Sequence, residues 1–251
     1  MKDSIYYPSC FALVSGGKDS LSTAQVLHEA GKLEACIALE TGVSTPDWKQ
    51  FVIQTCSDRQ WPLEFYATDE SYDDIVLRYG FPGPSRHKFY MERLKGRCIR
   101  KFRKQHPKGI LASGTRAQES VRRSANAVPV GQWEGTPIVA PIFDWSTDET
   151  WDFFRDRGFN RAPGYATLQI SGDCLCGAFA REGELDAVRF HYPKIAARFD
   201  ALSTQMNGHV PANRCEWGWG WKKPIKLGRD ENMICNNCQR DLFEDEPCSI
   251  A

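Results

Sequence analysis

The chain has 251 residues, enough to bury a substantial core as one large domain or two small ones. Its 32 basic and 32 acidic side chains cancel, so no net charge draws nucleic acid or a membrane surface to the molecule as a whole. The sequence contains no hydrophobic leader and no long apolar segment, which predicts a cytoplasmic protein with no membrane partner.

The first motif is a glycine loop, SGGKDS, between the apolar run 11–14 and a segment with helical spacing from residue 21 onward. Glycines let the backbone approach a phosphate closely, and the start of a helix presents free N–H groups and a positive dipole end. The loop is too short to be a Walker-type P-loop. We predict that it binds a pyrophosphate-sized anion through six residues, Ser15, Gly16, Gly17, Lys18, Asp19 and Ser20.

Strand and helix patterns alternate through the first half of the chain. Apolar runs predict strands over 5–14, 34–39, 63–67, 109–112 and 138–142, and helical spacing predicts helices over 21–30, 47–57, 71–79 and from 144 onward. This order predicts an α/β fold, a Rossmann-like parallel sheet with helices on both faces. Ligands of such sheets bind at the carboxyl ends of the strands. Thr41 and Gly114 lie at such ends, so we predict that both contact the nucleotide, although Thr41 can equally belong to a plain turn.

The composition changes near residue 160, where glycine, cysteine and tryptophan become frequent. We predict a nucleotide-binding domain over 1–160 and a cysteine-rich C-terminal region over 161–251 that packs on it. A helix is expected over 184–198. The tryptophan repeat at 217–221 either stacks on a base or packs the tail against the main domain.

Two segments rich in basic residues can face an anionic substrate. The segment 86–108 is either a solvated surface helix or a wall over that substrate. In the segment 113–123, Arg116 and Arg122 can form bidentate contacts to phosphate or sulfate. We therefore count Arg116 and Arg122, together with Lys18 and Asp19, as candidate catalytic residues.

The ten cysteines fall into distinct groups. Three of them, Cys10, Cys36 and Cys56, lie in apolar or helical contexts and are expected to be buried. Five others lie beside polar or glycine-rich residues with spacing typical of metal ligands: Cys98, Cys174, Cys176, Cys235 and Cys238. Four thiolates from this set can hold either a [4Fe–4S] cluster or tetrahedral Zn²⁺. Cys215 and Cys248 are ambiguous.

In these motifs the sequence resembles the phosphoadenosine phosphosulfate (PAPS) reductase-like branch of the adenine nucleotide α-hydrolases, the PP-loop ATP pyrophosphatase superfamily. The matching stretches are SGGKDS, Arg97-Cys98 with Lys101, and the segments 113–123, 141–151 and 162–176. The resemblance implies that ATP, or an adenylyl sulfate nucleotide, lies across the strand ends, with Arg116 and Arg122 near its phosphate or sulfate end. It also implies that a cysteine placed like Cys98 joins a later pair, here Cys174 and Cys176, which favours [4Fe–4S] over Zn²⁺.

Two features favour ATP-dependent activation over sulfonucleotide reduction. SGGKDS is intact, as in ATP-cleaving members, and no Glu-Cys-Gly motif of true PAPS reductases is present around Cys248. We predict an enzyme of sulfur metabolism or sulfur transfer that cleaves ATP to AMP and pyrophosphate, with Mg²⁺ on the phosphates. A sulfur-donor protein is a further expected partner, and the acceptor stays open. The alternatives are a PAPS or APS reductase, and a component of a DNA or RNA sulfur-modification complex with 86–108 as its nucleic-acid face.

Overall fold

The structure is a computed structural model that describes residues 8–118, 128–206 and 208–222. Its centre, in this part of the chain, is a six-stranded sheet in the order β3-β2-β1-β4-β6-β5. The strands are β1 Cys10–Leu13, β2 Leu33–Glu40, β3 Leu63–Ala67, β4 Leu111–Ala112, β5 Val130–Trp133 and β6 Thr136–Val139. All neighbours pair in parallel except β5, which is antiparallel to β6. The predicted α/β fold with a mostly parallel sheet is therefore confirmed.

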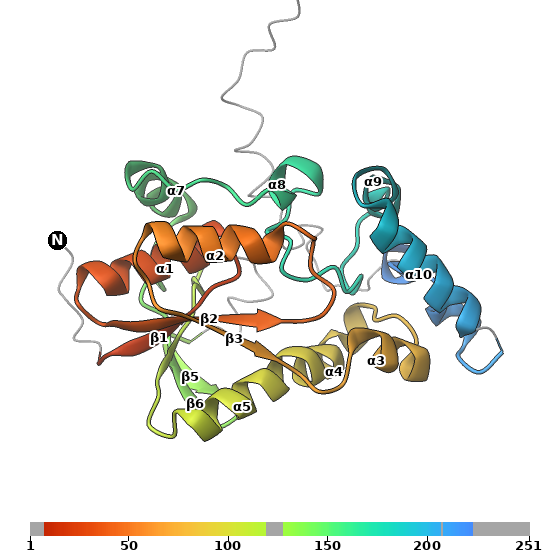
Figure 1. The fold of residues 1–251 in the computed structure, drawn as a ribbon, viewed down its shortest axis with the longest axis horizontal. Helices are drawn as coiled ribbons and strands as arrows, with labels where there is room; N and C mark the ends of the chain where they lie inside the picture. Colours follow the sequence, from red (N-terminus) through yellow and green to blue (C-terminus); the bar gives the residue numbers. More distant parts are fainter. Residues whose placement is uncertain (1–7, 119–127, 207, 223–251) are drawn as a thin grey trace, which may run out of the picture.

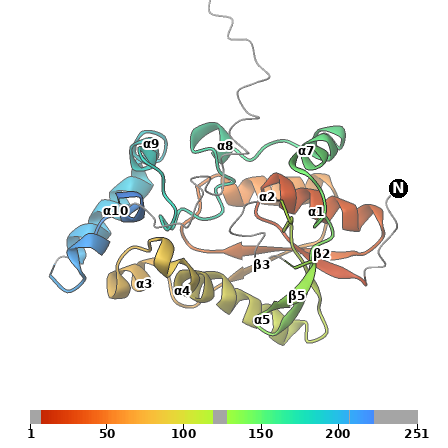
Figure 2. The ribbon, with the colours of Figure 1, turned by 180° about the vertical axis from the view of Figure 1, so that it is seen from behind.

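Helices cover both faces of this sheet, as Figures 1 and 2 show. The α-helices of the described chain are α1 Lys18–Glu29, α2 Trp48–Asp58, α3 Tyr72–Tyr79, α4 His87–Met91, α5 Arg97–Gln105, α7 Thr147–Asp156, α8 Gly164–Thr167, α9 Glu184–His191 and α10 Pro193–Gln205. The first two lie over one face and α5 lies over the opposite face. A π-helical turn, Glu92–Gly96, joins α4 to α5. No helix among the described residues is long and apolar enough to cross a bilayer.

Separate apolar clusters hold the layers together. On one face, Leu21 and Leu27 of α1 and Val52 of α2 pack on the sheet, because helical spacing places them on the buried side. On the other face, Ile99 and Phe102 of α5 pack against strand side chains. A third cluster joins α3 and α4 to α9, α10 and the buried tryptophans near the end of the described chain. The domain boundary at residue 160 stays a prediction.

Two predictions about secondary structure were wrong or incomplete. The helix expected over 184–198 is two helices, because Pro193 has no N–H to continue α9 and instead starts α10. Strand β5 was not predicted. It is an edge strand that pairs with β6 through a tight turn at Glu134 and Gly135, and its Val130 is 65 % exposed, so it lacks the apolar run of a buried strand.

Candidate nucleotide and thiol site

The SGGKDS loop connects β1 directly to α1. Gly16 has φ +83°, a left-handed conformation that favours glycine, and Gly17 is the N-cap of α1. No side chain of the N-cap caps this helix, whereas Ser71 and Ser146 form capping boxes on α3 and α7. Because the first N–H groups of a helix have no partner within it, the start of α1 presents donors that an anion can use.

The loop is held in shape by its own side chains. Ser20 Oγ accepts a hydrogen bond from the Ser15 amide at 3.2 Å and donates to the Gly17 carbonyl at 2.8 Å. The indole N–H of Trp48 in α2 donates to the Ser15 carbonyl at 2.8 Å. The loop is therefore arranged before any ligand binds, which reduces the entropic cost of binding.

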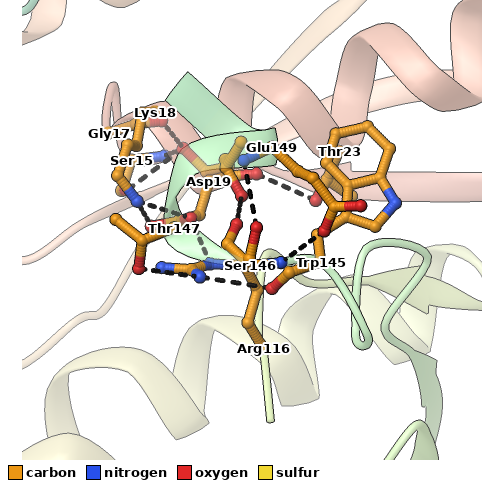
Figure 3. Close-up of polar contacts among 12 residues, drawn as sticks. Ser15, Gly17, Lys18, Asp19, Thr23, Arg116, Trp145, Ser146, Thr147 and Glu149 are labelled. Carbon is orange, nitrogen blue, oxygen red and sulfur yellow. Dashed lines mark hydrogen bonds and ion pairs between the residues drawn. The ribbon is translucent and has the colours of Figure 1, made fainter. Parts of the chain in front are cut away.

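The buried side chains of Lys18 and Arg116 both form ion pairs with Asp19, which is partly exposed (Figure 3). Lys18 Nζ lies 2.9 Å and Arg116 Nε 2.7 Å from the same Asp19 oxygen, and Arg116 also donates to Thr147 Oγ1. The side chains of Lys18 and Arg116 are only 2 % and 3 % exposed. Of the predicted catalytic residues, three are thus brought together, and Arg122 lies outside the described residues.

Gly114 brings the turn after β4 against the start of α1. A Cβ on Gly114 would lie 2.6 Å from the backbone carbon of Asp19, so no side chain fits there. This close approach places Ser113, Gly114 and Thr115 beside SGGKDS. The structure therefore brings Gly114 to the SGGKDS loop, and its predicted contact with the nucleotide stays a prediction.

A cavity of about 550 Å³ opens at these strand ends. One part of its wall comes from the loop and α1, with Ser15, Gly17, Asp19 and Ser20, and another from Leu13, Ile37 and Leu39 of β1 and β2. The wall also includes Trp48, Tyr165, Ser171, Asp173, Cys174, Cys176 and Lys95. Lys18 and Arg116 do not line it. They support Asp19, which does.

A cysteine-containing loop over 171–176, here called the cysteine loop, runs beside the exit of β2. Thr41 Oγ1 donates to the Asp173 carbonyl at 3.0 Å, and the Leu175 amide donates to the Val43 carbonyl at 2.6 Å. Thr41 is 2 % exposed. It holds the cysteine loop and is not part of the cavity wall, so its predicted contact with the nucleotide stays a prediction.

Lys95 and Asp173 place opposite charges beside the two cysteines. Lys95 Nζ lies 2.6 Å from Asp173 Oδ2. Burial disfavours the Lys95 ammonium, but the Asp173 carboxylate and Cys174 raise the Lys95 pKa above its usual range. A hydrogen bond from the Cys176 thiol, opposed by burial and aided by the Lys95 charge, lowers the pKa of Cys174 to about 7. The same hydrogen bond and burial raise the pKa of Cys176.

The predicted metal ligands are not assembled within the described chain. Cys98 is fully buried among the side chains of α5 and the sheet and donates to the Leu94 carbonyl at 3.1 Å. Cys174 and Cys176 instead pack against the cluster that includes α3 and α10. Among described residues, no group of three or more His, Cys, Asp or Glu side chains is arranged to hold a metal ion. Cys235 and Cys238 lie outside them. The described thiols therefore do not fit a four-thiolate site, and the iron–sulfur or zinc centre stays a prediction.

Ion pairs neutralise part of the basic segment 86–108. Glu70 accepts hydrogen bonds from both Arg93 and Arg97, and Lys101 lies 2.7 Å from Asp69. These partners reduce the positive charge that the segment offers to a nucleic-acid backbone, whose recognition depends on uncompensated cations. A nucleic-acid partner stays a prediction.

Sequence reasoning did not assign Lys95, Asp173, Tyr165 and Ser171 to the site. The signal for Asp173 and Ser171 was present, because they stand in the same small-residue turn as the two cysteines. Tyr165 Oη lies 3.3 Å from where a Gly17 Cβ would be, a contact that no local pattern reveals. Lys95 was one of many basic residues in its segment, and only the π-helical turn distinguishes it.

Comparison with known families identifies the group to which this fold and loop belong. The sequence profile of the phosphoadenosine phosphosulfate reductase domain matches residues 9–167, more than half of the chain. The chain belongs to this family. The part of the PAPS reductase domain that matches runs from β1 through α8 and so includes SGGKDS, Gly114 and Arg116. A search among curated protein sequences gives no match.

Several solved structures are similar to this PAPS reductase-family chain. PAPS reductase from Candida auris shares 15% identity, with 63% of this chain and 77% of that chain covered and a TM-score of 0.48. The U34-tRNA thiolase NcsA from Methanococcus maripaludis, solved with its [4Fe-4S] cluster, shares 14% identity over 78% and 70% of the two chains, with a TM-score of 0.44. FMN adenylyltransferase from Candida glabrata, solved with FAD and pyrophosphate, shares 14% identity over 60% of this chain and 49% of its own, with a TM-score of 0.42.

Proposed function

We propose that this PAPS reductase-family chain uses ATP to activate an acceptor for sulfur transfer, releasing AMP and pyrophosphate. One observation carries the proposal: the uncapped start of α1 and the cysteines of the cysteine loop line the same cavity. The first suits a polyphosphate, because its free N–H groups point at an anion. The second suits sulfur chemistry, because a thiolate is a strong nucleophile.

The loop supplies the charge stabilisation that the reaction needs. As pyrophosphate leaves the α phosphorus, negative charge grows on its oxygens, and the N–H groups at the start of α1 would stabilise that charge. Lys18 carries a full positive charge at the start of α1, and here Asp19 neutralises it. We therefore infer that a bound polyphosphate competes with Asp19 for the Lys18 ammonium.

Asp19 also fits the role of a magnesium ligand. Mg²⁺ in nucleotide sites is held by one or two carboxylates together with phosphate oxygens, and the Asp19 side chain is 23 % exposed and reaches the cavity. The metal would neutralise phosphate charge during the cleavage. Arg116 would keep Asp19 in place through its 2.7 Å ion pair. The acceptor oxygen attacks the α phosphorus, and a sulfur nucleophile then displaces AMP from the adenylylated acceptor.

ATP binding by the full chain tests the role of the loop. Trp48 bonds to Ser15, so its fluorescence should report binding of MgATP. In Gly17→Val the new side chain meets Tyr165 and covers the start of α1, so we expect affinity to fall tenfold or more. Ser20→Ala removes three hydrogen bonds that shape the loop, those with the Ser15 amide, the Ser15 hydroxyl and the Gly17 carbonyl. It should weaken binding about threefold to tenfold, which corresponds to a net loss of about 1 kcal/mol.

Ser22→Ala is the matched control, because the Ser22 hydroxyl lies two residues further along α1, is buried and has no hydrogen-bond partner among the residues that the structure describes. It should bind ATP as the wild type does. Equal affinity of Gly17→Val and wild type would contradict the proposed nucleotide site. With candidate acceptors present, formation of AMP and pyrophosphate in equal amounts is the expected reaction, and ADP formation would contradict it.

Sulfonucleotide reduction is the second candidate, because the matched family is described as the PAPS reductase domain. A reductase would need a tail thiol as nucleophile, for which Cys248 is the candidate, and Cys248 lies outside the described residues. The two candidates differ in their products. A reductase releases sulfite from PAPS or APS when a dithiol is supplied and consumes no ATP. The proposed activating enzyme consumes ATP and leaves PAPS and APS intact.

A further inference from the structure

We propose that Cys174 and Cys176 form a thiol pair that carries sulfur into the nucleotide cavity: Cys174 takes a sulfane sulfur atom, and Cys176 releases it as hydrosulfide. The inference rests on the proposed sulfur transfer and names the residues that perform it.

The first argument is position. Among the described cysteines, Cys174 and Cys176 line the cavity, whereas Cys10, Cys36, Cys56 and Cys98 are buried. Ser171 begins the cysteine loop, and its Cβ lies 3.8 Å from where a Gly17 Cβ would be. Cys174 follows three residues later, so its Cα lies within about 11 Å of that of Ser171. The two thiols are therefore close enough to SGGKDS for a small molecule to bridge them.

The second argument is the charge beside the thiols. The π-helical turn before α5 brings Lys95 to the cavity wall, where its ammonium lies 2.6 Å from Asp173 Oδ2. Ser171 Oγ donates to the other Asp173 oxygen at 2.9 Å and so orients the carboxylate. A cation fixed in the cavity wall would stabilise the negative charge of a persulfide formed there.

The third argument is rigidity. The Tyr72 hydroxyl donates to the Cys176 carbonyl at 2.9 Å, and the Trp217 indole N–H donates to the Leu175 carbonyl at 2.8 Å. The Leu175 amide is bonded to Val43 on the other side. The main chain between the two cysteines is thus held at three points. This keeps the two cysteines in fixed positions relative to each other.

The chemistry balances in two transfers and a reduction. The Cys174 thiolate attacks the outer sulfur of a small-molecule persulfide, forms a Cys174 persulfide and expels the donor thiolate. The Cys176 thiolate then attacks the inner sulfur of Cys174, which forms a Cys174–Cys176 disulfide and expels hydrosulfide, the nucleophile that an adenylylated acceptor consumes. An external dithiol reduces the disulfide and is itself oxidised, which restores both thiols.

The test uses the full chain, purified without oxygen, and glutathione persulfide as the probe. We expect wild type to release hydrosulfide and to form the Cys174–Cys176 disulfide, both read by mass spectrometry and a sulfide assay. Cys176→Ser should stop at a Cys174 persulfide, one sulfur atom heavier, and Cys174→Ser should show neither product. Cys215→Ser is the control, because Cys215 is partly exposed but outside the cavity wall, and it should behave as wild type.

A second variant pair separates charge from structure. Lys95→Met should slow persulfide uptake by Cys174 about tenfold or more, and Lys95→Arg should largely restore it, because the arginine keeps the positive charge. Equal uptake in Lys95→Met would overturn the role of Lys95.

Two results would overturn the thiol pair itself: stoichiometric iron and sulfide that protect both cysteines, or persulfide uptake that persists in Cys174→Ser. ATP binding by the wild type is measured in parallel. Persulfide uptake that fails while ATP still binds overturns only the thiol pair, whereas absent ATP binding overturns the proposed function.

Discussion

Asp19 is the residue on which the geometry of the nucleotide loop depends most. It accepts ion pairs from Lys18 and Arg116, and its backbone carbonyl accepts the Thr23 hydroxyl at 2.9 Å. Two buried cations without this carboxylate would each carry a large desolvation cost, because a buried charge needs a partner. The residues that the sequence nominated as separate catalytic groups are therefore one electrostatic unit with a structural role as well.

Cys174 shows how a local environment changes reactivity. Its partner Cys176 lies two residues away and donates a hydrogen bond that favours the thiolate, while burial opposes it and Lys95 supports it. The pKa of Cys174 in the folded chain, about 7, lies below that of an unfolded cysteine. The thiolate therefore stabilises the fold above the unfolded pKa, and this contribution is lost as pH falls through about 7.

Alkylation by iodoacetamide gives a direct measure of this shift. The modification rate of Cys174 should rise about tenfold per pH unit below pH 7 and level off above it, because only the thiolate reacts. Cys176→Ser removes the hydrogen-bonding thiol and should move the midpoint upward. Peptide mass spectrometry follows the site. A midpoint near the pKa of an ordinary cysteine, about 8.5, would contradict the assigned environment.

At the level of secondary-structure elements, the site depends on a close contact between the turn after β4 and the start of α1. Gly114 allows this contact, since a Cβ there would lie 2.8 Å from the Asp19 carbonyl oxygen and from the Ser20 amide nitrogen. The neighbouring atoms belong to the backbone of Asp19 and Ser20, which cannot adopt another rotamer as a side chain can. Because Gly114 has no Cβ, the turn after β4 can lie directly against the start of α1 at the mouth of the cavity.

Gly114→Ala should therefore separate these two elements. We expect a loss of about 1–3 kcal/mol in the free energy of unfolding, as for other overpacked positions, together with weaker ATP binding. Urea unfolding and the Trp48 fluorescence titration measure the two effects. Gly31→Asn is the control, because nothing lies within 4 Å of a Cβ at Gly31 and asparagine tolerates its φ of +63°. Unchanged stability and ATP affinity in Gly114→Ala would show that the backbone contact is dispensable.

At the scale of the whole molecule, the C-terminal part of the described chain packs against the cysteine loop and bonds to it. Trp217 stacks on Phe199 of α10 with ring centroids 5.2 Å apart and donates to the Leu175 carbonyl. Trp219 donates to the Phe81 carbonyl at 2.7 Å. Both tryptophans are buried, so the structure shows them packing the tail onto the rest of the chain. Trp217 also forms part of the cavity wall.

Truncation of Trp217 should thus affect both stability and thiol chemistry. Trp217→Ala removes a buried aromatic ring and should cost about 3–5 kcal/mol of unfolding free energy. Trp217→Phe keeps most of the packing but loses the N–H bond to the cysteine loop. It should therefore lower the unfolding free energy less than Trp217→Ala does, and it should still change the rate of Cys174 alkylation. Thermal unfolding and the alkylation rate measure these effects. Equal alkylation in Trp217→Phe and wild type would show that the hydrogen bond does not position the loop.

The alternation of apolar runs and helical segments was sufficient to predict the parallel sheet, and SGGKDS was sufficient to predict a glycine loop between β1 and the start of a helix. Both are local patterns, because a strand, a glycine turn and a helix start are encoded by neighbouring residues. Anion binding by this loop stays a prediction. The edge strand β5 was missed because its side chains are largely exposed, so its sequence has no run of apolar residues. The break between α9 and α10 was missed because the apolar pattern continues through Pro193, whose missing N–H ends the first helix.

Tertiary structure alone decided which charged and sulfur-bearing residues meet. Arg116 reaches Asp19 across 97 positions and Lys95 reaches Asp173 across 78. Cys98, which the resemblance groups with the later cysteine pair, lies on the buried side of α5 in the core. Side-chain partners separated by such distances depend on how helices pack over a sheet, and no local pattern specifies that packing.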